Sequence, residues 1–327
     1  MNSFDTLKIG MSLDCLERID YQRFDERALV VNEIETSKKF ILKREVHLGV
    51  NSFEVDRKRG KAILECSAKL LKGRYFEGIN QNTIEAALHN FNEYGFATLN
   101  IGRVLGIGEV FRCDVTKSFD VSHGPELEIS RLALYQANPL FRVELYKDES
   151  AVFTSRAKKN PLRLIIYRKY PELLLKKNHR LLSYIEIKET KNMIRSDLNL
   201  RTFEHIRKML EIENHDLKSA LGSTAHPITR FFNKIKARFP DTTSFPKSLC
   251  HLPFGELKNR IGWEGIIKLC HKDMNELRCF IKSKIKGDVS RYIRQAKPIF
   301  FEMMAKDLSP SVPNSFQSEI ERKLFAA

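Results

Sequence analysis

The 327-residue sequence has no long hydrophobic run. Its apolar stretches are only a few residues long, well below the roughly 20 residues that a membrane-spanning helix needs. Residues Met1 to Asp5 lack the basic and apolar stretches of a signal peptide. We therefore expect a cytoplasmic protein that makes no use of a membrane.

Cysteine pairs with metal-binding spacing are also missing. Six cysteines are present, but none belongs to the C-x-x-C pair that is typical of structural zinc sites. The dipeptides Cys250–His251 and Cys270–His271 match no common zinc spacing, so we do not expect structural zinc there. Cys66 and Cys113 alternate with polar residues, which favours small buried side chains on strands.

The common nucleotide-binding and hydrolase motifs are absent. Gly102, Gly106 and Gly108 form neither a G-x-G-x-x-G nor a Walker motif. The sequence has no G-x-S-x-G, H-E-x-x-H or EF-hand pattern either. These absences argue against a nucleotide hydrolase, an α/β-hydrolase and a zinc protease.

Positive charge, in contrast, is abundant. The 56 lysines and arginines exceed the 41 acidic residues and give a formal charge of +15. Such a balance favours a polyanionic partner, such as nucleic acid or an acidic membrane and nucleic acid above all, over the plain alternative of a soluble basic protein. The length suits about two domains. We expect an α+β domain over residues 1–215 and a basic, mostly helical domain over residues 216–327, which would bind DNA or have an accessory role.

Four segments alternate polar and apolar residues, which is the pattern of a strand with one polar face. They span residues 64–69, 111–117, 164–169 and 194–201. In the second segment, Arg112, Asp114 and Thr116 share one face, and Cys113 lies on the other. If the four strands belong to one sheet, its polar face would carry carboxylates, basic groups and a tyrosine, a set that suits phosphodiester chemistry.

The carboxylates of this face predict a metal site. Glu65, Asp114 and Asp197 would offer the oxygen ligands that Mg²⁺ or Mn²⁺ prefers. His47, on an expected strand over residues 45–56, is a candidate imidazole ligand. Taken singly, a strand aspartate is usually solvated and a strand histidine usually hydrogen-bonded, so the prediction depends on the three strands together.

A tyrosine on the same face is a candidate nucleophile. Tyr167 and Lys169 are two residues apart on the expected strand, so a lysine ammonium would lie beside the hydroxyl and stabilise negative charge there. Tyr170 would face the other way and ranks below Tyr167. A structural tyrosine beside a surface lysine is the ordinary alternative. The candidate phosphate-binding or carboxylate-pairing residues are Lys69, Arg112, Arg195 and Arg201.

Taken in order, these segments resemble the phage/plasmid replication protein II/X family, the replication initiators of filamentous phages and related plasmids. The likeness covers about residues 40–210. It is carried by the four segments Glu65–Lys69 with Gly73, Arg112–Thr116, Tyr167–Lys169 with Glu172 and Leu173, and Arg195–Asp197. Asp197 stands where the family usually has glutamate. The H-U-H pair of many rolling-circle nickases is absent.

The resemblance implies an antiparallel sheet of the RRM-like palm type that nicks and rejoins one DNA strand. Tyr167 would attack the origin and stay joined to a 5′ phosphate, with Mg²⁺ or Mn²⁺ as cofactor. The implied partners are single-stranded or supercoiled origin DNA and the host helicase and polymerase. Two alternatives stay open, a non-catalytic DNA-binding initiator and a metal-dependent nuclease without a covalent step.

Overall fold

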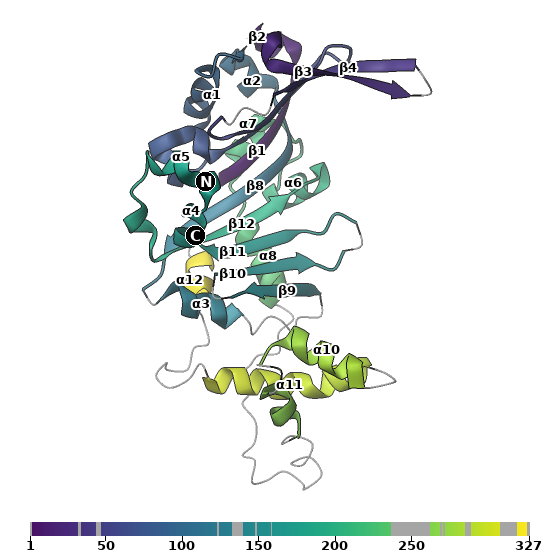
Figure 1. Cartoon of the computed structure of the whole chain (residues 1–327), viewed down its shortest axis with the longest axis vertical. Helices are drawn as coiled ribbons and strands as arrows, with labels where there is room; N and C mark the ends of the chain where they lie inside the picture. Colours follow the sequence, from purple (N-terminus) through teal and green to yellow (C-terminus); the bar gives the residue numbers. More distant parts are fainter. Residues whose placement is uncertain are drawn as a thin grey trace.

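The computed structural model describes residues 2–31, 34–43, 47–122, 124–132, 140–147, 149–157, 159–236, 262–268, 270, 272–284, 289–307 and 319–325. It is an α+β protein with one large antiparallel sheet and a mostly helical C-terminal region, which confirms the expected class (Figure 1). No described helix has both the length and the apolar character needed to cross a membrane.

The sheet has ten strands in the order β3-β4-β5-β6-β1-β8-β12-β11-β10-β9, and every neighbouring pair is antiparallel. Its strands are β1 (Ser3–Ser12), β3 (Phe24–Val31), β4 (Ile34–Leu42), β5 (Val50–Asp56), β6 (Lys61–Ser67), β8 (Glu109–Asp120), β9 (Phe141–Tyr146), β10 (Ser150–Ser155), β11 (Arg163–Arg168) and β12 (Met193–Leu200). A second sheet pairs β2 (Leu16–Ile19) with β7 (Ala97–Leu99).

The four polar-faced segments become β6, β8, β12 and β11 and lie close together in the sheet. β8, β12 and β11 are direct neighbours, and β1 alone separates β6 from β8. The predicted common sheet is therefore present. His47 precedes β5 instead of lying within it, because that strand begins at Val50.

The other face of the sheet is apolar and packs on the main hydrophobic core. Cys66 and Cys113 are fully buried there, as expected from the alternation. Helix α8 contacts β8 and β12, and α6 and α7 contact β8. The helices on this core are α6 (Phe203–Leu210), α7 (Leu217–Gly222), α8 (Pro227–Lys236) and α12 (Glu319–Phe325).

Short helices bring further side chains to the ends of the strands. The 3₁₀ segment η3 (Ala68–Glu77) follows β6 directly, and α4 (Lys169–Leu173) follows β11 directly. The others in this part of the chain are η1 (Leu13–Cys15), η2 (Tyr21–Arg23), α1 (Ile84–Asn92), α2 (Ile101–Ile107), α3 (Pro125–Arg131), η5 (Lys176–Asn178), α5 (His179–Leu182) and η6 (Ile187–Thr190).

A second hydrophobic cluster involves α10 (Met274–Lys284) and α11 (Val289–Asp307), the helices drawn beyond β9 in Figure 1. The basic, mostly helical part expected from the sequence thus contains these two helices. Helices α7 and α8 contact the sheet and α12 contacts α8, and buried residues of all three helices belong to the main hydrophobic cluster, which therefore extends past residue 215. The dipeptide Cys250–His251 lies outside the described residues, as does His271.

Candidate active site

Strand pairing assembles one polar face from β6, β1, β8, β12 and β11. Directly paired residues of antiparallel strands point to the same side of the sheet. One row across the strands is Ser67, Thr6, Asp114 and Asn199, and a neighbouring row joins Glu65 to Lys8 and Arg112. Farther along the same face, Tyr167 on β11 pairs with Arg195 on β12. The predicted carboxylates and Tyr167 therefore share a face with Arg112 and Arg195.

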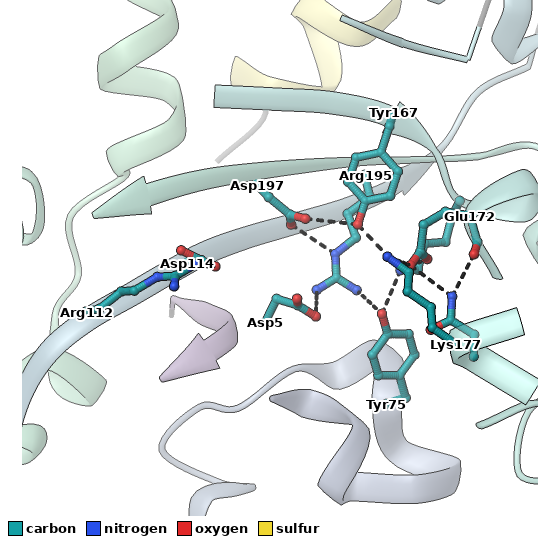
Figure 2. Close-up of polar contacts among 11 residues, drawn as sticks. Asp5, Tyr75, Arg112, Asp114, Tyr167, Glu172, Lys177, Arg195 and Asp197 are labelled. Carbon is teal, nitrogen blue, oxygen red and sulfur yellow. Dashed lines mark hydrogen bonds and ion pairs between the residues drawn. The ribbon is translucent and has the colours of Figure 1, made fainter. Parts of the chain in front are cut away.

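Arg195 is the centre of this face and is only 1% exposed. Its Nε donates to Asp197 Oδ1 at 3.0 Å, and its Nη2 donates to Asp5 Oδ1 at 2.6 Å. The remaining Nη1 donates to the hydroxyl oxygen of Tyr75 at 3.0 Å (Figure 2). The guanidinium thus joins β12, β1 and η3 in one buried network.

Tyr167 lies against this network (Figure 2). Its hydroxyl donates to Asp197 Oδ2 at 2.9 Å, while the other carboxylate oxygen of Asp197 is held by Arg195. Lys169 Nζ lies 3.5 Å from the same hydroxyl oxygen. The hydroxyl proton therefore points at a carboxylate, and an ammonium approaches the oxygen lone pair.

Lys169 reaches Tyr167 by a different route from the predicted one. The strand ends at Arg168, and Lys169 is the first residue of α4, so the two side chains do not meet through strand alternation. The lysine is 1% exposed and donates to Glu172 Oε2 at 2.7 Å, one helical turn away, and to Tyr75 Oη at 2.6 Å. Three acceptors thus fix its ammonium.

Tyr75 and Asp5 are functional candidates that the sequence did not suggest. Tyr75 comes from η3, which has no strand pattern, and its buried hydroxyl accepts from both Lys169 and Arg195. Asp5 reaches Arg195 at an irregularity of the β1–β8 pairing between Phe4 and Thr6. Such bulges redirect side chains next to functional sites. No periodic pattern could have identified either residue.

Burial and mutual charge determine the protonation of this network. Burial, reinforced by the Asp197 carboxylate, raises the pKa of Tyr167 well above its usual value near 10, so the hydroxyl is protonated at neutral pH. Burial, reinforced by the Arg195 guanidinium, lowers the pKa of Lys169 to about 8. Asp5 keeps a lowered pKa despite its burial, because Arg195 and Lys169 lie beside it.

A second network lies beside the first, on β6 and β8. Arg112 donates to Glu65 Oε1 at 3.3 Å and to Asp114 Oδ2 at 3.1 Å, and Lys8 lies 3.7 Å from Glu65. Burial raises the pKa of Asp114, and Arg112 offsets the shift only in part. Arg112 therefore pairs with the carboxylates, which was one of its two predicted roles.

The polar face also carries buried oxygen atoms, the atom type that a hard cation prefers. Asp114 Oδ1, Ser67 Oγ and Thr116 Oγ1 are buried without a hydrogen-bond partner, and the pairing puts their residues on one face. Within the described ranges, however, no three His, Cys, Asp or Glu side chains are grouped closely enough to hold a metal ion. The residues present fit an ion such as Mg²⁺, which commonly uses one or two carboxylates and completes its shell with water and substrate phosphate.

The remaining predicted residues lie in three different places. The His47 ring packs against Tyr94 and Phe96, at 4.7 and 4.9 Å between centroids. Phe96 contacts Phe53, which is on the apolar face, so the structure does not bring His47 to the carboxylates. The other two are Lys69, which is half-buried and interacts electrostatically with Glu172 and Asp5, and Arg201, which is exposed after the end of β12.

The chain matches no family model, and no curated protein is significantly similar to it.

Proposed function

We propose that this protein is a rolling-circle replication initiator that nicks and rejoins one DNA strand through a 5′-phosphotyrosine intermediate. Tyr167 is the proposed nucleophile, and the sheet would serve as an RRM-like palm. The observation that carries the proposal is the position of the Tyr167 hydroxyl, which lies between a carboxylate at 2.9 Å and a buried ammonium at 3.5 Å. A nucleophile beside a proton acceptor and a charge-stabilising group is the usual arrangement for covalent catalysis.

The surrounding cations support a phosphodiester substrate. Lys169 and Arg195 are held rigidly by their partners and would stabilise the negative charge that develops on the phosphate oxygens. Lys69 lies at the edge of the same network and is half-buried, so it can contact the phosphate directly. The formal charge of +15 would attract the DNA, and the basic helices α10 and α11 would add backbone contacts.

The proposed cofactor is Mg²⁺ or Mn²⁺. Asp114 would hold the ion through its unpartnered carboxylate oxygen. Thr116, two residues along β8, and Ser67, two strands away, carry further buried hydroxyls on the same face. The ion would supply neutralisation of the phosphate charge. All three predicted carboxylates are paired with arginines, but Asp114 has a second, buried oxygen without a hydrogen-bond partner. Asp114 is therefore the strongest protein ligand among the three carboxylates and one imidazole predicted from the sequence.

A covalent-adduct assay tests the proposal. The protein is incubated with Mn²⁺ and a pool of single-stranded oligonucleotides of random sequence, labelled at the 3′ end, and run on a denaturing gel. We expect labelled protein in this lane. A matched pool labelled at the 5′ end should give none, because the 5′ fragment leaves with a free 3′ hydroxyl.

Three controls separate the alternatives. Tyr167→Phe should form no adduct, whereas Tyr146→Phe, an exposed tyrosine on β9, should react like the wild type. Cleavage without an adduct would indicate a nuclease that has no covalent step. Binding without cleavage in any metal would indicate a non-catalytic DNA-binding initiator, and either result would refute the proposed chemistry.

A further inference from the structure

The proposed reaction requires a group that takes the proton of Tyr167. Tyr167 keeps its proton at neutral pH, so the hydroxyl must lose it as the oxygen attacks phosphorus. Two groups lie close enough to be considered. Asp197 Oδ2 is 2.9 Å from the hydroxyl oxygen and accepts its hydrogen bond, while Lys169 Nζ is 3.5 Å away and approaches as a donor.

We propose that Asp197 is the general base for Tyr167, and that Arg195, anchored by Asp5 and Tyr75, is the positioning residue that aims it. This inference rests on the proposed nicking function. It gives Asp197 a role different from the metal ligation expected from the sequence. A nucleophile bonded to a base, which is itself oriented by a third group, is a recurring catalytic arrangement.

The geometry assigns separate tasks to the two carboxylate oxygens. Oδ1 accepts from Arg195 Nε at 3.0 Å, which fixes the carboxylate plane and leaves Oδ2 aimed at the tyrosine. Arg195 cannot turn away, because Asp5 and Tyr75 hold its other two nitrogens at 2.6 and 3.0 Å. Side chains from β11, β12, β1 and η3 thus converge on one proton transfer (Figure 2).

Lys169 is less suited to be the base. Its ammonium donates to Glu172 and Tyr75 at 2.7 and 2.6 Å, and these bonds favour the charged form that cannot accept a proton. The charged and titratable groups around Asp197 come from six elements. They are Arg195 on β12, Tyr167 on β11, Asp114 diagonally across on β8, Asp5 on β1, Tyr75 on η3 and Lys169 on α4.

The step balances as follows. The O–H bond of Tyr167 breaks and its proton moves to Asp197 Oδ2, while Tyr167 Oη forms a bond to phosphorus. The bond from phosphorus to the 3′ oxygen breaks, and that oxygen takes a proton from water. In rejoining, the 3′ hydroxyl attacks phosphorus and gives its proton to water, while the Asp197 carboxylic acid returns its proton to the departing tyrosine oxygen.

The test compares adduct formation by the wild type, Asp197→Asn and Asp197→Glu with the same random 3′-labelled pool and Mn²⁺. Asparagine keeps the shape and still accepts from Arg195, but it cannot take a proton. We expect its rate to fall by about 10²–10⁴-fold, the usual contribution of a general base. Glutamate should restore part of the loss, and Asp120→Asn, an exposed aspartate at the end of β8, should react like the wild type.

The pH dependence separates a base from a structural carboxylate. Without a base, Tyr167 must ionise by itself, so the rate of Asp197→Asn should rise about tenfold per pH unit across the neutral range. The inference would be overturned if Asp197→Asn were slower but kept the wild-type pH dependence, or if it reacted as fast as Asp120→Asn. Either result would leave the proposed nicking function intact. Failure of the wild type to form an adduct would overturn both.

Discussion

Replacing Tyr75 by phenylalanine should destabilise the sheet domain, because one hydroxyl oxygen satisfies two buried cations. Tyr75 Oη accepts from Lys169 Nζ at 2.6 Å and from Arg195 Nη1 at 3.0 Å, and both cationic side chains are 1% exposed. Tyr75→Phe keeps the ring in the core, where the tyrosine is 2% exposed, and removes only this acceptor. The loss of stability in this variant therefore reports on the polar network and not on the packing of the ring.

The magnitude follows from the two bonds. A hydrogen bond to a charged group contributes about 1.5–3 kcal/mol, and a buried donor left without an acceptor carries a penalty of similar size. Lys169 keeps Glu172 and Arg195 keeps two carboxylates, so we expect the free energy of unfolding to fall by about 2–5 kcal/mol in total.

Urea unfolding followed with two probes checks this prediction. Far-UV circular dichroism follows the whole fold, in which the sheet is the largest element, whereas the single tryptophan, Trp263, packs on the second hydrophobic cluster. Tyr75→Phe should lower the midpoint seen by dichroism more than the midpoint seen by tryptophan fluorescence. Replacing the exposed Tyr146 by phenylalanine should change the free energy of unfolding seen by either probe by no more than about 0.5 kcal/mol. A Tyr75→Phe protein as stable as this control would refute the bridging role of the hydroxyl.

Two further predictions concern charge and backbone. Between about pH 8, where folded Lys169 loses its proton, and the ordinary 10.5, the unfolded chain binds more protons, so stability rises with pH. From pH 8 to 10.5, the free energy of unfolding of the wild type should rise by about 3 kcal/mol relative to that of Lys169→Met. A difference between the two proteins that does not change with pH would contradict the lowered pKa. Gly49→Ala should lower the free energy of unfolding by about 2–4 kcal/mol, because φ is +82° and a Cβ would lie 2.4 Å from the Leu70 nitrogen. The control Gly60→Ala, at φ +62° with open space around the Cβ position, should lower it by about 1 kcal/mol. Equal losses of stability in the two variants would contradict the clash at Gly49.

The individual strands of the site could be predicted from the sequence, but their contacts could not. Alternation over residues 111–117 and 194–201 assigned Asp114 and Asp197 to polar faces, and the pairing shows that these faces coincide. The prediction of Lys169 beside Tyr167 was correct in proximity and wrong in cause, because the strand ends at Arg168 and a helical turn brings the lysine back. The expectation for His47 depended on a strand that begins three residues later.

The sequence by itself determined which residues share a strand face, that Cys66 and Cys113 are buried and how basic the chain is, because side-chain alternation and charge are local properties. Only the tertiary structure decided that β1 lies between β6 and β8, that a pairing irregularity turns Asp5 toward Arg195, and that Tyr75 joins two cations. These contacts link residues 94 to 190 positions apart, and such distances are fixed by the packing of the whole sheet. The same packing presents the Tyr167 proton to Asp197, on which the proposed chemistry depends.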